Sequence, residues 1–204
     1  MGKVSVAVFA SGRGSNFKSI LDEIKAGRCS AEIKVLVSNN PDAPAIKTAK
    51  ENGIPVEIFI KENYSSREEM DSAIKRKLEG YGVELIVLAG YMLLIKGKEL
   101  LGSYPIINIH PALLPSFPGV DAQKQAFEHG VKISGVTIHF VDAGLDNGPI
   151  IYQEAVDISE CESADEAAAK ILKVEHSAYA KVVDSFSKGT YVIEGRKTRF
   201  VPKS

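Results

Sequence analysis

The sequence predicts an α/β fold of the doubly wound, Rossmann-like kind: a mostly parallel sheet with helices on both faces and a C-terminal antiparallel extension. Short runs that are apolar throughout alternate with helical segments over about the first 110 residues, as in parallel strands buried on both faces. From residue 133 an apolar–polar alternation begins, which indicates antiparallel strands. The 204 residues, 45% of them hydrophobic, can bury the core of a single domain.

Turn and capping signals place the elements in order. Ser66 and Ser163 each stand three residues before a glutamate, as in a capping box, so a helix is expected after each. Asn16 is expected to cap the first helix, and Pro111 to end the fifth strand. The expected strands cover residues 4–9, 33–38, 56–60, 85–89, 106–109, 133–140 and 150–156. The expected helices cover residues 16–26, 43–51, 66–79, 122–128 and 164–186, and residues 191–193 and 198–201 are expected to form a terminal hairpin.

Composition limits the class of protein. The 25 basic and 26 acidic residues are not segregated into blocks, so nucleic acid is not an expected partner. Two cysteines without metal-type spacing indicate a reducing compartment. The apolar run after Met1 is too short for a signal peptide, and no run reaches membrane-spanning length. We therefore expect a cytoplasmic protein that acts on small molecules, as a monomer or homodimer.

A glycine-rich loop follows the first expected strand. Residues 12–16 (GRGSN) would open a helix, and the backbone N–H groups and dipole at a helix N-terminus favour a bound phosphate. A dinucleotide site would need a third glycine where Phe17 stands, and an acid where Ser38 and Asn39 end the second strand. A phosphomonoester therefore fits better than a dinucleotide, and a tight turn without a ligand is the alternative.

Asn108 and His110 lie two residues apart at the end of the fifth expected strand, so both point to one face. With a carboxylate such as Asp146, they would suit acyl transfer: the amide steadies an oxyanion, the imidazole moves a proton and the acid holds the imidazole. The alternatives are a structural histidine and, for Asp142 and Asp146, turn-forming aspartates. His139 is expected to be a buried, hydrogen-bonded side chain. No histidine pair has metal-ligand spacing with a third ligand nearby, so no metal is expected.

Four motifs together resemble the folate-dependent formyltransferases, over essentially the whole chain. They are ASGRGSN (residues 10–16), LAGYM (88–92), NIHPALLPSFPG (108–119) and HFVDAGLDNGPI (139–150). The resemblance implies transfer of the formyl group of 10-formyltetrahydrofolate, a cosubstrate, to the primary amine of glycinamide ribonucleotide. Residues of about 1–105 would hold the phosphoribosyl substrate, and those of about 106–204 would complete the catalytic and folate-binding half.

The resemblance also implies roles for individual residues. The implied catalytic residues are Asn108, His110 and Asp146. The implied substrate-binding residues are Gly14, Ser15, Asn16 and Glu175. The implied folate-binding residues are Arg67, Met92, Leu93, Leu94, Ile95, Asn108, Val141, Asp142 and Asp146. Leu93 departs from the arginine that other members carry there, which leaves only backbone contacts expected at that position.

The sequence leaves two alternatives to this function open and disfavours a third. A 10-formyltetrahydrofolate hydrolase would use water in place of the amine, although such enzymes carry an additional domain ahead of a strand like the one at Val4. A non-catalytic sensor of nucleotide phosphates would need only residues 12–16. A methionyl-tRNA formyltransferase would need a further basic domain beyond Ser204.

Overall fold

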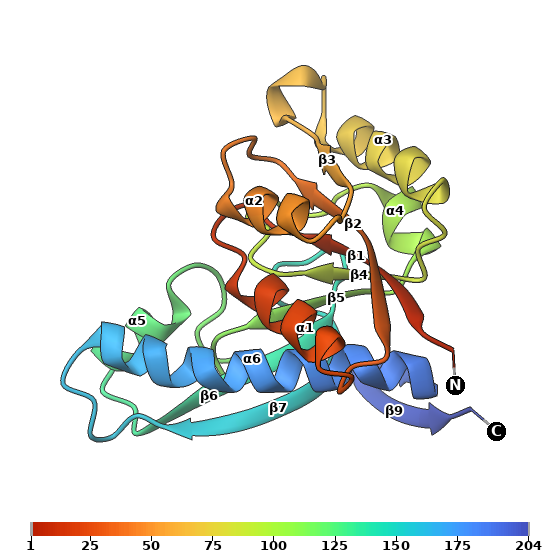
Figure 1. Cartoon of the computed structure of the whole chain (residues 1–204). Helices are drawn as coiled ribbons and strands as arrows, with labels where there is room; N and C mark the ends of the chain where they lie inside the picture. The colour runs from red at the N-terminus through yellow and green to blue at the C-terminus, as the bar shows by residue number, and fades with distance from the viewer. Residues whose placement is uncertain (1, 204) are drawn as a thin grey trace.

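The computed structural model describes residues 2–203, and its main sheet there has seven strands (Figure 1). These strands are β1 (Val4–Phe9), β2 (Ala31–Ser38), β3 (Val56–Ile58), β4 (Leu85–Leu88), β5 (Ile106–His110), β6 (Ile133–Phe140) and β7 (Ile150–Asp157). Their order is β3-β2-β1-β4-β5-β6-β7. The pairs from β3 to β5 are parallel, and β6 and β7 are antiparallel additions. The predicted doubly wound sheet with an antiparallel extension is confirmed.

The direction of winding reverses between β1 and β4, because β2 and β3 add to one side of β1 and β4 and β5 to the other. Open α/β sheets bind ligands outside the carboxyl ends of strands at such a switch point. The carboxyl-terminal part of β5 pairs antiparallel with β6, and this pairing sets Asn108 opposite His139. The fold therefore directs two polar side chains to the edge where a ligand is expected.

Helices cover both faces of the sheet (Figure 1). They are α1 (Ser15–Lys25), α2 (Pro44–Glu51), α3 (Arg67–Glu79), α4 (Lys98–Ser103), α5 (Ala122–Glu128) and α6 (Ala164–Lys188), with a 3₁₀ turn η1 (Lys61–Asn63). Helices α1, α2, α5 and α6 contribute to one apolar core, which includes Phe17 and Tyr179. Helices α3 and α4 contribute to a second core, which includes Met70 and Leu100. Among residues 2–203, no helix has the length and apolar character needed to cross a membrane.

The capping signals are confirmed, whereas the predicted start of α1 is wrong. Ser66 accepts a hydrogen bond from the backbone N–H of Glu69 at 3.1 Å, and Ser163 from that of Glu166 at 3.2 Å. The N-cap of α1 is Gly14 rather than Asn16, and it has a left-handed φ of 69°. A Cβ at Gly14 would lie 2.7 Å from Cβ of Ala45, so close packing of α2 and backbone conformation both require glycine there.

Other boundaries differ by a few residues. Strand β3 ends at Ile58, earlier than expected, and α6 continues to Lys188. Helix α4 was not predicted, because its six residues include a glycine and give little periodic signal; it is anchored by Leu100, which is fully buried. The terminal hairpin is longer than predicted and consists of β8 (Gly189–Glu194) and β9 (Lys197–Pro202).

Candidate active site

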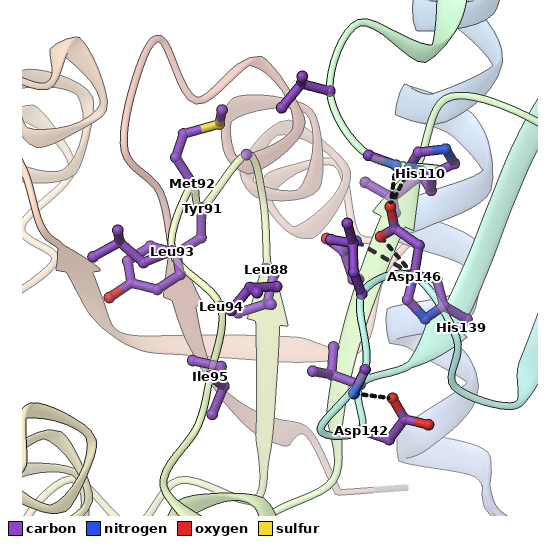
Figure 2. A pocket seen from close by; sticks show the side chains of 18 of the residues that line it. Leu88, Tyr91, Met92, Leu93, Leu94, Ile95, His110, His139, Asp142 and Asp146 are labelled. Carbon is purple, nitrogen blue, oxygen red and sulfur yellow. Dashed lines mark hydrogen bonds and ion pairs between the residues drawn. The ribbon is translucent and has the colours of Figure 1, made fainter. Parts of the chain in front are cut away.

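A cavity of about 550 Å³ opens beyond the carboxyl ends of β4 and β5. Its lining consists of Leu88, Gly90, Tyr91, Met92, Leu93, Leu94, Ile95, Asn108, Ile109, His110, Gly119, Val120, Asp121, His139, Val141, Asp142, Gly144, Leu145 and Asp146. Figure 2 shows the side chains of residues 91–95 on one side of the cavity and His110, His139 and Asp146 on the other. The cavity thus brings together the residues predicted to be catalytic and those predicted to bind folate, apart from Arg67.

His110 and Asp146 form the polar end of this cavity. Nδ1 of His110 lies 3.4 Å from Oδ2 of Asp146, and Nε2 donates to the carbonyl of Phe117 at 2.7 Å. Oδ2 of Asp146 also accepts from the backbone N–H of Gly119 at 2.8 Å. Asp146 has a φ of 48° and Phe117 a φ of 54°, a conformation that is unfavourable for side chains other than glycine. The two loops that carry Phe117 and Asp146 therefore hold the imidazole between them.

His139 belongs to the site, although its role was not predicted. It is buried as expected, and its Nδ1 donates to the carbonyl of Phe140 at 2.8 Å. Burial lowers the pKa of His139 below its ordinary value of 6.5, while the Phe140 carbonyl and Asp146 oppose the shift. Neutral Nε2 therefore accepts from Nδ2 of Asn108 at 3.4 Å and fixes the orientation of the Asn108 amide.

The pairing of β5 with β6 places Asn108 opposite His139. The sequence predicted polar residues on one face of each strand, but it predicted antiparallel pairing only between residues 133–140 and 150–156, not between β5 and β6. The register that brings Asn108 to His139 depends on the loop between them and could not be predicted.

Residues 92–95 form an apolar wall, in which Met92 is 67% and Leu94 47% exposed while Ile95 is buried. The backbone of this wall is held from behind. The N–H of Met92 donates to Oγ of Ser11 at 2.8 Å, and the guanidinium of Arg67 donates to the carbonyl of Leu94 at 2.8 Å. Arg67 therefore supports the wall and does not line the cavity.

Asp71 anchors the end of the same wall from a fully buried position. Its Oδ2 accepts from the backbone N–H groups of Lys96 at 2.7 Å and Gly97 at 2.8 Å, and its Oδ1 lies 3.1 Å from Nη2 of Arg67. Neither the contact of Arg67 with Leu94 nor the anchoring by Asp71 was expected, because both join segments about 25 residues apart in the sequence.

The predicted substrate-binding residues lie at the start of α1 and on α6. Gly14, Ser15 and Asn16 form the N-terminus of α1, and Nδ2 of Asn16 donates to Oε2 of Glu175 on α6 at 2.7 Å. Glu175 is only 5% exposed, and burial raises the pKa of its carboxyl while the Asn16 hydrogen bond partly opposes that shift. Oδ1 of Asn16 is buried without a hydrogen-bond partner. The structure thus brings the helix N-terminus and Glu175 together.

Two remaining predicted residues lie on the loop after β6. Val141 and Asp142 both line the cavity, and Oδ1 of Asp142 accepts from the backbone N–H of Gly144 at 2.8 Å, as in a turn. Between residues 2 and 203, no cluster of three or more His, Cys, Asp or Glu side chains is arranged to hold a metal ion.

Comparison with known proteins gives the class. Residues 4–183 match the formyl transferase family. The chain is 46% identical over 179 residues to phosphoribosylglycinamide formyltransferase of Bacillus subtilis. The aligned segment covers 87% of this chain and 91% of that protein. The chain belongs to the formyl transferase family.

Solved structures agree with this class. The crystal structure of glycinamide ribonucleotide transformylase 1 from Symbiobacterium toebii superposes with a TM-score of 0.92 at 42% identity, over 98% of this chain and 94% of that one. Phosphoribosylglycinamide formyltransferase from Bacillus halodurans superposes with a TM-score of 0.85 at 42% identity, over 89% of this chain and 94% of that one.

Proposed function

We propose that this chain is an enzyme of purine biosynthesis that transfers the formyl group of 10-formyltetrahydrofolate to the primary amine of 5-phosphoribosylglycinamide. The products are formylglycinamide ribonucleotide and tetrahydrofolate. The observation that carries the proposal is the meeting of Asn108, His110 and Asp146 at one end of a cavity with a largely apolar wall. Membership of the formyl transferase family supports the same chemistry.

The proposed reaction joins the amine nitrogen to the formyl carbon and breaks the bond from that carbon to N10 of the folate. The amide of Asn108 would donate to the oxyanion of the tetrahedral intermediate. Protonated His110 would stabilise that oxyanion through its positive charge, because both of its ring nitrogens already face acceptors. One amine proton passes to the leaving N10 through a water held by Asp146. Holding both substrates in contact supplies much of the remaining acceleration. These groups handle the charge at oxygen and the proton transfer, so the proposal includes no metal.

The proposed ribonucleotide site uses the N-terminus of α1. Backbone N–H groups of Gly14, Ser15 and Asn16 would bind the phosphate, where the helix dipole favours negative charge. Glu175 would contact the substrate near its amine. The unpartnered Oδ1 of Asn16 supports a ligand at this place, because a buried acceptor without a partner is costly unless a bound donor satisfies it.

The proposed folate site is the cavity itself. Met92, Leu93, Leu94 and Ile95 would face the pterin, with Val141, Asp142 and Asp146 on the opposite side. Arg67 contributes by supporting the carbonyl of Leu94 rather than by direct contact. We further propose that residues of about 1–105 and 106–204 form the two halves of one domain.

The test is a spectrophotometric assay of the purified protein with 10-formyltetrahydrofolate, with and without glycinamide ribonucleotide. Tetrahydrofolate formation that requires the ribonucleotide is the expected result. Equal turnover without the ribonucleotide would identify a hydrolase and contradict the proposal. If neither mixture shows turnover but the protein still binds glycinamide ribonucleotide, a non-catalytic sensor of nucleotide phosphates would be favoured over an enzyme.

We also propose a cytoplasmic location and a monomer or homodimer as the active form. Cys29 and Cys161 are free thiols, which suits a reducing compartment. Analytical ultracentrifugation at two protein concentrations distinguishes the monomer from the dimer.

A further inference from the structure

The loop that carries Asp146 is thinly supported on one side. Leu145 and Asp146 line the 550 Å³ cavity and also a second cavity of about 160 Å³, so the loop forms a partition between the two. The second cavity is lined as well by Asn147, Gly148 and Arg196. Because a cavity replaces packed side chains behind the loop, the position of Asp146 depends on contacts at the ends and tip of the loop as well as on its own contacts with Gly119 and His110.

The start of the loop is held by an aromatic cluster that includes the terminal hairpin. Phe140 ends β6, and its ring packs edge-on against Tyr191 of β8 with centroids 6.1 Å apart and against Phe186 of α6 at 6.3 Å. Tyr191 packs in turn on Phe200 of β9 at 5.3 Å. The hydroxyl of Tyr191 is hydrogen-bonded to Ser185 at 2.8 Å, which fixes the ring.

The end and tip of the loop are held by hydrogen bonds from the same hairpin. Oγ1 of Thr198 donates to the carbonyl of Ile150, the first residue of β7, at 2.7 Å. Nη1 of Arg196, in the hairpin turn, donates to Oδ1 of Asn147 at 3.3 Å. Asn147 is the neighbour of Asp146, so this bond acts next to the proposed catalytic carboxylate.

We propose that the β8–β9 hairpin is a positioning device for the Asp146 loop, with Arg196 and Thr198 as its positioning residues. The inference rests on the proposed function for the role of Asp146. The hairpin follows α6 (Figure 1) and lies beyond residues 4–183, which match the formyl transferase family. Loss of either hydrogen bond lets Asp146 move away from His110, whose Nδ1 is already 3.4 Å distant.

The test compares Arg196→Ala and Thr198→Val with Arg199→Ala, a control on the same hairpin. Arg199 pairs with Glu194 inside the hairpin, with nitrogen and oxygen 4.0 Å apart. For each protein, kcat and KM are measured in the formyl-transfer assay, and hydrogen–deuterium exchange is measured on the peptide that covers residues 141–149. Thr198→Ser, which keeps the hydroxyl, is the rescue variant.

Arg196→Ala and Thr198→Val are expected to lower kcat about three- to tenfold, the effect of one lost hydrogen bond, with KM for the ribonucleotide unchanged. Exchange of residues 141–149 rises in both variants, whereas Arg199→Ala and Thr198→Ser match the parent. Asn147→Ala combined with Arg196→Ala lowers kcat no further than either change alone.

Exchange in Arg196→Ala and Thr198→Val equal to that in Arg199→Ala would overturn the proposal, and so would faster exchange with unchanged kcat. The exchange measurement needs no activity. If the parent protein fails to transfer formyl groups, the proposed function fails, and exchange alone then decides whether the hairpin positions the loop.

Discussion

His110 turns each ring nitrogen toward an acceptor, the carbonyl of Phe117 and the carboxylate of Asp146. An imidazolium carries a donor on each nitrogen and satisfies both acceptors at once. A second histidine, His139, is held neutral by burial and orients Asn108. His110 and His139 thus lie on neighbouring strands but have different tasks, which their surroundings determine.

The first prediction concerns this polar end of the cavity. His110→Ala and Asp146→Asn are each expected to lower kcat by roughly 10²- to 10⁴-fold, the usual contribution of a positioned acid–base group. Steady-state kinetics measure the effect, and circular dichroism checks that each variant folds. Asp157→Asn, an exposed change on β7, is the control and should retain parent kcat. Turnover close to the parent in either test variant would remove that residue from the mechanism.

The second prediction concerns the buried carboxyl of Glu175. Its pKa is raised above the ordinary 4.5 by burial, so the folded state binds this proton more tightly than the unfolded state. The stability it contributes is present below pH 4.5 and is lost as pH rises through the folded pKa. The Glu175→Gln side chain does not titrate, so this variant keeps its stability as pH rises. The Tm of Glu175→Gln minus the Tm of the parent is therefore expected to increase as pH rises above about 4.5.

The same variant is expected to raise KM for the ribonucleotide roughly tenfold, since a charge-assisted hydrogen bond to the substrate becomes neutral. Scanning calorimetry at several pH values and substrate kinetics measure the two effects. A Tm difference that does not change with pH would contradict the explanation by burial.

At the scale of elements, the apolar wall of residues 92–95 depends on α3. Asp71 binds the backbone N–H groups of Lys96 and Gly97, and Arg67 binds the carbonyl of Leu94. The segment that forms the wall lies outside helices and strands, so its backbone N–H and C=O groups lack the hydrogen bonds of regular secondary structure. Side chains from α3 supply these hydrogen bonds instead. This makes the first turns of α3 part of the binding site without direct contact.

The third prediction tests this support. Asp71→Ala takes away the carboxylate that pairs with Arg67 and binds two backbone N–H groups, and it is expected to lower the free energy of unfolding by about 3–5 kcal/mol. Asp71→Asn keeps the shape and one acceptor, so it should fold and raise KM for the formyl folate more than KM for the ribonucleotide. Urea unfolding and kinetics measure these changes. Glu68→Ala, exposed on the same helix, is the control and should shift stability by no more than about 0.5 kcal/mol.

Local signals predicted most elements, and long-range contacts account for what was missed. The capping boxes at Ser66 and Ser163 are local in sequence and were confirmed. The cap of α1 was wrong because the requirement for Gly14 comes from Ala45, on another helix. Arg67 was assigned to folate by resemblance, but its contact with Leu94 depends on how α3 packs.

At the scale of the whole molecule, the two proposed halves share the larger of the two apolar cores. The larger apolar cluster joins Val8 and Val87 of the parallel sheet to Ile138 of β6 and Tyr179 of α6. Tyr179 also donates its hydroxyl to the carbonyls of Leu88 and Ile107, which belong to different halves. Each half therefore buries part of its apolar surface against the other, in addition to the second core that α3 and α4 form with the sheet.

The fourth prediction follows from this shared core. The protein is expected to unfold in urea in a single transition, with coincident midpoints by far-ultraviolet circular dichroism and by tyrosine fluorescence. The chain has seven tyrosines and no tryptophan, so the fluorescence reports tyrosine alone. A fragment of residues 1–105 should remain unfolded. Separate transitions, or a folded fragment, would show that the halves are independent units.

The location of the cavity could be predicted from the sequence, because open α/β sheets bind ligands at the carboxyl ends of their strands. Asn108 and His110 were predicted at that edge from strand alternation, and both line the cavity. The contribution of His139 and the support by the terminal hairpin could not be predicted, since each depends on the register or packing of segments distant in sequence.

Ser11 joins the two proposed substrate sites through a single hydroxyl. It donates to Asn39 beside the loop of residues 12–16 and accepts from the backbone N–H of Met92 in the apolar wall. A ligand that shifted Ser11 from one side would change a hydrogen bond on the other, and the two binding sites would then be coupled. That coupling is reciprocal: whatever factor the ribonucleotide adds to folate affinity, the folate adds to ribonucleotide affinity.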